Sequence, residues 1–143
     1  MKKTPPDSAR VAAVGHLADE AAAAAERAHA PYSHFRVGAA VLGGSGEIYR
    51  GANVENASFG LGTCAERVAL ASARVGGETT ITDLAIACID AAADAPLEAK
   101  MPCGACRQWL QELAPNARVH IAGETRSFSV AELLPHPFTL RRP

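Results

Sequence analysis

The chain has 143 residues, of which 48% are apolar and 20% are charged, and its formal net charge is -1. This length fits one domain, and the composition excludes a disordered tail or a coiled coil. Aromatic residues make up only 5% of the chain, so the basic, aromatic-studded surface typical of nucleic-acid-binding proteins is absent. We expect a single domain over residues 1–143 that acts on a small molecule, with neither nucleic acid nor membrane as a partner.

Apolar spacing and turn residues indicate how this domain is organised along the chain. A helix is predicted after Pro6 and before Pro31, followed by two antiparallel strands at 35–42 and 47–52 around a glycine-rich turn. The remaining predicted elements are a helix over 63–76, a buried strand over 83–89, a helix over 103–113 and a hairpin of 119–121 with 127–129. These elements predict a three-layer α/β/α sandwich with a mixed sheet of about five strands.

Two of the predicted helices carry apolar stripes that should face the core. On the second helix the stripe consists of Cys64, Val68, Ala71 and Val75. On the third helix it consists of Cys106, Trp109, Leu110 and Leu113. Both stripes place a cysteine at the buried side of a helix start.

Two short motifs, Thr63-Cys64-Ala65-Glu66-Arg67 and Pro102-Cys103-Gly104-Ala105-Cys106, indicate a catalytic zinc site. Three thiolates can hold a zinc ion and leave its fourth position for a water, and the carboxylate of Glu66 could move that water's protons. Both motifs begin predicted helices, where the positive end of the helix dipole favours thiolates. Arg67 is a neighbouring cation that can offset the negative charge of the thiolates.

Other interpretations of these residues remain open at this point. Thr63 and Glu66 also have the spacing of a capping box. Cys103 and Cys106 could form a redox dithiol, or could complete a closed four-thiol zinc site together with Cys64 and Cys88 in a non-catalytic interaction domain. Cys88 lies in a continuous apolar run and is best interpreted as a buried small hydrophobe. The five histidines have no metal-ligand spacing.

Five stretches spread along the chain follow the pattern of one family. They are residues 31–40 (PYSHFRVGAA), 53–57 (NVENA), 61–67 (LGTCAER), 102–108 (PCGACRQ) and 132–135 (ELLP). A ligand, one spacer, a glutamate and a later Pro-Cys-x-x-Cys form the signature of zinc-dependent base deaminases. In this ordered agreement the chain resembles the small, homotetrameric cytidine deaminases.

The resemblance implies hydrolytic deamination of cytidine and deoxycytidine in pyrimidine salvage, with Zn²⁺ as the only cofactor, in a cytoplasmic homotetramer with shared active sites. It implies that Cys64, Cys103 and Cys106 bind the zinc and that Glu66 carries protons. It also implies that the Ala65 amide and Phe35 contact the base, and that Asn53 and Glu55 contact the ribose. A tail phenylalanine of a neighbouring subunit can stack on the base in this family, which makes Phe138 the candidate here.

The chain departs from the family pattern at three places. Met101 replaces a common serine, Phe59 replaces a frequent tyrosine, and residues 137–140 (PFTL) replace a usual Phe-Gly-Pro ending. A relative that deaminates another aminopyrimidine, such as blasticidin S, is the alternative within the same chemistry. Glu55 favours an ordinary nucleoside.

Overall fold

The computed structural model of the protein describes residues 7–142. Its sheet contains β1 (Val37–Gly43), β2 (Ile48–Ala52), β3 (Ile81–Cys88), β4 (Arg118–Ile121) and β5 (Ser127–Ser129), in the order β2-β1-β3-β4-β5. β3 and β4 are parallel, and the other neighbouring pairs are antiparallel. The mixed five-strand sheet and both predicted hairpins are therefore confirmed.

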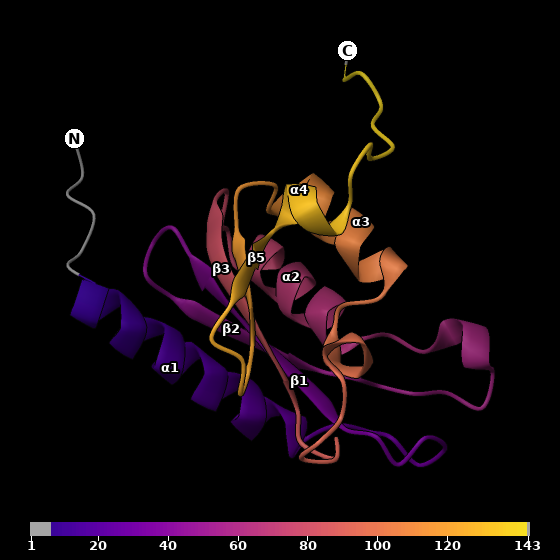
Figure 1. The fold of residues 1–143 in the computed structure, drawn as a ribbon. Coiled ribbons are helices and arrows are strands. Elements are labelled where there is room, and N and C mark those ends of the chain that lie inside the picture. The colour runs from indigo at the N-terminus through magenta and orange to yellow at the C-terminus, as the bar shows by residue number, and fades with distance from the viewer. Residues whose placement is uncertain (1–6, 143) are drawn as a thin grey trace.

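Helices cover the two faces of this sheet (Figure 1). α1 (Asp7–Ala25) lies on one face, and α2 (Ala65–Val75), α3 (Gly104–Leu113) and α4 (Val130–Leu133) lie on the other. Side chains alternate along β1, so Ala40 joins the cluster that contains Leu17 of α1, whereas Val41 joins the cluster that contains Leu70 of α2 and Leu110 of α3. The predicted three-layer α/β/α arrangement is confirmed.

Glycines on the strands allow α1 and α2 to approach the sheet closely. A Cβ atom on Gly38 would lie 1.8 Å from the carbonyl oxygen of Ala21, and one on Gly51 would lie 2.4 Å from the carbonyl oxygen of Ala65. The alanine run of α1 is accordingly part of the core, with Ala21, Ala24 and Ala25 buried. At Gly51 the same close contact fixes the start of α2, which bears Cys64.

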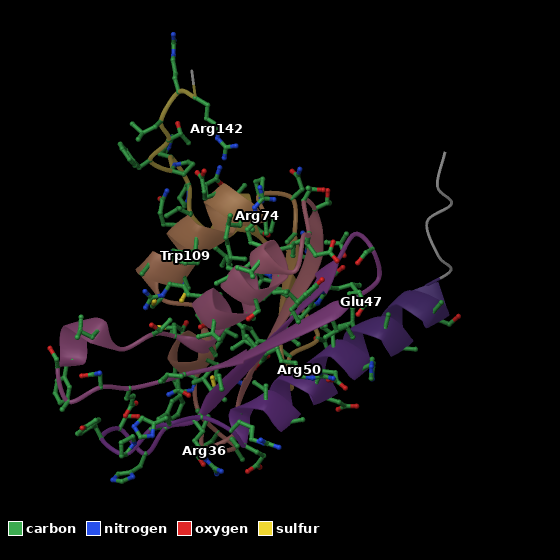
Figure 2. The ribbon with its side chains drawn as sticks, turned by 180° about the vertical axis from the view of Figure 1, so that it is seen from behind. Arg36, Glu47, Arg50, Arg74, Trp109 and Arg142 are labelled. Atoms are coloured by element: carbon green, nitrogen blue, oxygen red, sulfur yellow. The ribbon has the colours of Figure 1, made fainter. Side chains whose placement is uncertain are left out.

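The predicted apolar stripe of the second helix is wrong, and that of the third helix is partly wrong. The buried residues of α2 are Ala65, Glu66, Ala69, Leu70 and Ala73. Val75, the last residue of α2, is 90% exposed and lies beyond the first two turns that contact Gly51. On α3, Cys106 and Leu110 are buried as predicted, but Trp109, labelled in Figure 2, is 39% exposed.

Three short elements were not predicted: η1 (Phe59–Leu61), η2 (Leu97–Lys100) and α4. α4 begins with a complete capping box, in which the Glu132 amide donates to Ser129 Oγ at 3.1 Å and the Ser129 amide donates to Glu132 Oε2 at 2.7 Å. None of the helices between residues 7 and 142 combines the length and apolar character needed to cross a membrane.

Candidate active site and metal centre

Three thiols meet where α2 and α3 begin. Cys64 is the N-cap residue of α2, Cys103 is the N-cap residue of α3, and Cys106 lies in the first turn of α3. Cys103 Sγ lies 3.8 Å from Cys64 Sγ and 3.5 Å from Cys106 Sγ, and all three sulfur atoms lie within 4.8 Å of one another. Tetrahedral zinc with Zn–S bonds of about 2.3 Å requires sulfur atoms about 3.8 Å apart. The three thiols therefore fit zinc and leave one coordination position open.

The fourth cysteine does not join this cluster. Cys88, at the end of β3, is half-buried, and burial raises the pKa of its thiol to about 11. It lies outside the group of side chains, among the described residues, that could hold a metal together. The geometry thus gives no support to a closed site with four thiolates.

Interactions within the cluster give its thiols different pKa values. The pKa of Cys64 is lowered to about 5, first by a hydrogen bond from Cys106 and further by Arg67, whose Nη2 lies 3.5 Å from Cys64 Sγ. The pKa of Cys106 is raised by its interaction with the Cys64 sulfur and by burial. The contact with Cys64 in turn raises the pKa of Arg67. Arg67 thus supplies a positive charge beside the thiolate.

Glu66 is the second residue of α2 and is only 5% exposed. Cys106 Sγ lies 3.5 Å from its Oε2 atom, and burial raises the pKa of its carboxyl group. Because the N-cap of α2 is Cys64 and not Thr63, and makes no side-chain capping bond, the capping-box alternative is wrong. A buried carboxyl beside a metal site with a raised pKa is suited to carry protons.

A cavity of about 260 Å³ opens onto the metal centre. Its lining includes most of the residues selected from the sequence: Phe35, Asn53, Glu55, Cys64, Ala65, Glu66 and Cys103. Phe138 is not among them. It is 69% exposed on the tail that runs away from the sheet beyond α4 (Figure 1), where its carbonyl oxygen accepts a hydrogen bond of 3.0 Å from Gln108.

The two polar side chains assigned to the ribose are already hydrogen-bonded to the protein. Asn53 Oδ1 accepts from the Val37 amide at 2.8 Å, and Asn53 Nδ2 donates to the Phe35 carbonyl oxygen at 2.9 Å. Glu55 accepts three hydrogen bonds from Tyr32 and Ser33. Sequence reasoning missed Ser33, although it lies in the 31–40 stretch, because nothing in that stretch shows which side chain it reaches.

A family model described as "Cytidine and deoxycytidylate deaminase zinc-binding region" matches residues 14–122. The cytidine deaminase of Halalkalibacterium halodurans is 44% identical over 127 residues, which cover 86% of this chain and 92% of that protein. The chain belongs to the cytidine deaminase family. Because the family's zinc-binding region spans all three clustered thiols, Zn²⁺ is the metal of this site.

Other members of the cytidine deaminase family agree in sequence and fold. The cytidine deaminase of Mycobacterium tuberculosis H37Rv is 39% identical over 124 residues, covering 87% of this chain and 88% of that protein. The crystal structure of the Burkholderia pseudomallei cytidine deaminase superimposes with a TM-score of 0.77 at 42% identity, covering 87% of this chain and 98% of that one.

Proposed function

We propose that this chain catalyses the hydrolytic deamination of cytidine and deoxycytidine to uridine and deoxyuridine, with release of ammonia, in pyrimidine salvage. One observation carries the proposal: a buried carboxyl group, Glu66, lies 3.5 Å from a thiol of the zinc cluster and lines the same cavity. The relatives named cytidine deaminase support the choice of substrate.

Residues at the start of α2 would carry the chemistry. Zinc held by the three thiolates supplies Lewis acidity, which lowers the pKa of water and makes it a nucleophile at neutral pH. Glu66 accepts a proton from the attacking water and returns protons to the ring nitrogen and the departing amino group. The Ala65 amide, one of those that the first turn leaves without an intrahelical partner, donates to the base carbonyl. Arg67 offsets the negative charge of the thiolates.

The opposite side of the cavity would hold the nucleoside. Phe35 packs along the base, while Asn53 and Glu55 bind the sugar through the hydrogen-bonding capacity that their protein contacts leave free. Each Glu55 oxygen has two acceptor positions, and Oε2 accepts one bond from Ser33. A sugar hydroxyl can therefore donate to this oxygen without displacing the serine.

Assembly as a homotetramer with shared active sites is part of the proposal. Phe59 and Leu61, both on η1, are 79% and 70% exposed, and large apolar side chains exposed on one short element favour a protein contact. Phe138 does not line the cavity of its own chain and would then reach the base bound by a neighbouring copy. The reduced state of all four cysteines suits the cytoplasm, where we place the enzyme.

An assay of ammonia release tests the reaction. The substrates are cytidine, deoxycytidine, cytosine, adenosine and blasticidin S, each with protein of measured zinc content. We expect turnover of the first two nucleosides only, with one zinc per chain. Deamination of blasticidin S without turnover of cytidine would replace the proposed substrate, and zinc-loaded protein inactive on the whole panel would reject the enzyme.

Mixed oligomers test the shared site. Glu66→Gln removes the proton carrier, and Phe138→Ala removes the stacking group, so each variant alone should be impaired. Co-expression of the two in one cell should restore activity at sites that combine Glu66 of one copy with Phe138 of another. Sedimentation should show tetramers. A mixture no more active than the average of the two variants contradicts the sharing of sites.

A further inference from the structure

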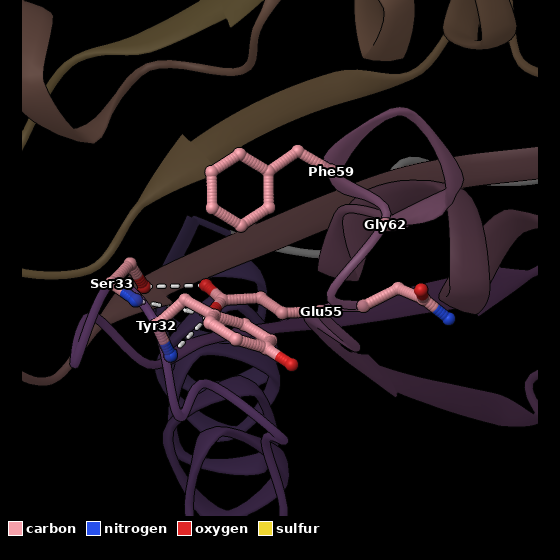
Figure 3. A pocket seen from close by; sticks show the side chains of 6 residues that line it. Tyr32, Ser33, Glu55, Phe59 and Gly62 are labelled. Carbon is pink, nitrogen blue, oxygen red and sulfur yellow. Dashed lines mark hydrogen bonds between the residues drawn. The ribbon is translucent and has the colours of Figure 1, made fainter.

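Ser33 lies in the turn between α1 and β1, where it contacts two residues assigned to the nucleoside. Its Oγ donates to Glu55 Oε2 at 2.5 Å and accepts from the Phe35 amide at 3.1 Å. Its own amide donates to Glu55 Oε1 at 3.0 Å, alongside the Tyr32 amide at 3.1 Å. Figure 3 shows this convergence of the turn on the carboxylate.

These contacts fix the orientation of the Glu55 carboxylate. Three donors converge on it, two on Oε1 and one on Oε2, and the Ser33 hydroxyl is the first cause of the lowered pKa of Glu55. A carboxylate held in its charged form is an acceptor only, so it can receive a sugar hydroxyl but cannot donate to one. The serine therefore fixes the direction of this group.

The same hydroxyl also holds the backbone of Phe35. The Phe35 amide donates to Ser33 Oγ, and the Phe35 carbonyl accepts from Asn53 Nδ2 at 2.9 Å. Both backbone polar groups of Phe35 are thus bonded to side chains and not to a neighbouring strand. The position of the Phe35 ring along the cavity therefore depends on Ser33 and Asn53.

Ser33 stands where two hollows meet. Together with Glu55 it lines both the cavity of about 260 Å³ over the metal centre and a neighbouring hollow of about 360 Å³ that Tyr32 and Phe59 also line (Figure 3). The residues that line the second hollow include none of the three clustered thiols. Ser33 is thus at the end of the site where Glu55 lies, and its hydrogen bonds go to Glu55 and Phe35.

We propose that Ser33 is a positioning residue that couples sugar recognition by Glu55 to base packing by Phe35. The inference rests on the proposed function, because it assigns Ser33 a role in binding the nucleoside of that reaction. The Ser33 hydroxyl orients both the Glu55 carboxylate, which accepts from the sugar, and Phe35, which packs on the base. A nucleoside with a complete sugar therefore gains more from Ser33 than one that lacks the 2′- and 3′-hydroxyls.

The test compares Ser33→Ala with a matched serine elsewhere in the chain. Ser45 has the same bonding pattern, since its Oγ accepts from the amide two residues on, Glu47, at 3.2 Å and donates to a glutamate, Glu78. It lies in the β1–β2 turn and lines neither hollow of the site. Ser45→Ala therefore controls for the loss of such a bond, and Ser33→Thr, which keeps the hydroxyl at an exposed position, controls for the substitution.

We expect Ser33→Ala to lower kcat/KM for cytidine by about 10- to 100-fold, the equivalent of one charge-assisted hydrogen bond. Most of the loss should appear in KM. With 2′,3′-dideoxycytidine the loss should be no more than about a third of that seen with cytidine. Ser33→Thr should recover activity to within about threefold, and Ser45→Ala should stay within about twofold of wild type on both substrates.

The inference is overturned by a Ser33→Ala protein within twofold of wild type on cytidine, or by equal losses on both nucleosides, which would indicate a structural role only. A double variant with Glu55→Gln supplies a further check. If Ser33 acts through Glu55, adding Ser33→Ala to Glu55→Gln should cost much less than it costs alone. If the wild-type protein fails to deaminate cytidine, the proposed function is rejected and the inference falls with it. If the wild type is active and the Ser33→Ala variant is unaffected, only the inference is rejected.

Discussion

Substituting Glu66 by glutamine separates its chemistry from its packing. The described residues bury two carboxylates, Glu66 at 5% exposure and Glu78 at 7%. Glutamine has nearly the shape of glutamate but cannot take a proton from water. Because general acid-base groups contribute about 100- to 10,000-fold, we expect kcat on cytidine to fall by roughly that factor in Glu66→Gln.

The same substitution should leave the fold nearly unchanged. Among residues 7–142, Cys106, at 3.5 Å, is the one other side chain that bonds to Glu66, and burial disfavours the charged form of this carboxyl. A neutral amide therefore relieves a desolvation cost while weakening a single poor hydrogen bond, so the change in free energy of unfolding should stay below about 1 kcal/mol. For a domain of this size that corresponds to a shift in Tm of roughly 5 °C or less.

Glu78→Gln is the matched control. Glu78 accepts from the Ser45 hydroxyl and from Tyr49, whose hydroxyl lies at 3.4 Å, and it lines no part of the metal cavity. Replacing charge-assisted bonds by neutral ones should cost about 1 to 3 kcal/mol of stability. We expect a lower Tm and a kcat within about twofold of wild type.

The assays are zinc content, thermal unfolding and cytidine turnover on one preparation of each variant. The two substitutions should give opposite results: loss of rate without loss of stability for Glu66, and loss of stability without loss of rate for Glu78. A Glu66→Gln protein that retains zinc and works within a few-fold of wild type would refute the proton-carrier role.

Three further predictions concern the metal, a surface ion pair and a close contact. Cys88→Ala should keep one zinc per chain by metal analysis, whereas Cys64→Ala should lose the metal; the reverse result would show that the wrong thiols were assigned. The bonds from Arg36 lower the pKa of Asp90 to about 2, below an ordinary value of about 3.9. Because the folded pKa is depressed, the stabilisation from Asp90 is complete above about pH 5 and declines as the pH falls toward 2. Asp90→Asn should therefore flatten this part of the dependence of Tm on pH, and an unchanged profile would contradict the assignment. Gly51→Ala places a Cβ 2.4 Å from the backbone of α2, so we expect a loss of about 1 to 3 kcal/mol in denaturant unfolding together with weaker zinc retention.

Local signals in the sequence predicted the elements of the fold better than they predicted which side chains are buried. Hairpins were predictable because glycine-rich turns separate short apolar strands, and both form. The inner stripe of α2 was not, because the face that packs is set by contacts with residues distant in sequence, such as that of Ala65 and Ala69 with Gly51, and Val75 at the helix end lies outside those contacts. The prediction that Trp109 is buried was wrong for a related reason. The spacing of apolar residues shows which face of a helix packs inward, but not how much space the core leaves for a large side chain.

The candidate site, like the fold, was predictable from the sequence only in part. The thiol cluster was predictable because Cys103 and Cys106 lie within one helical turn and metal geometry restricts the third ligand. The bonding of Asn53 was not predictable, because its amide interacts with backbone groups of residues 35 and 37. Every residue carries such backbone groups, so the sequence does not show which of them a side chain contacts. Ser33 escaped notice for a different reason, because the carboxylate that it contacts lies 22 residues away.

The metal centre also acts on the stability of the chain as a whole. Cys64 and Cys103 belong to different helices and are 39 residues apart, with all of β3 between them. An ion that binds both closes a loop of that length, and by the chain-entropy relation used for disulfides such a closure restricts the unfolded chain by about 4 kcal/mol. Zinc thus serves as a reversible cross-link, and because it binds the folded chain it makes unfolding depend on the concentration of free metal. Chelation would then disable catalysis and loosen the packing of α2 against α3 in one event, so that inactive protein is also the protein most readily cleared by proteolysis.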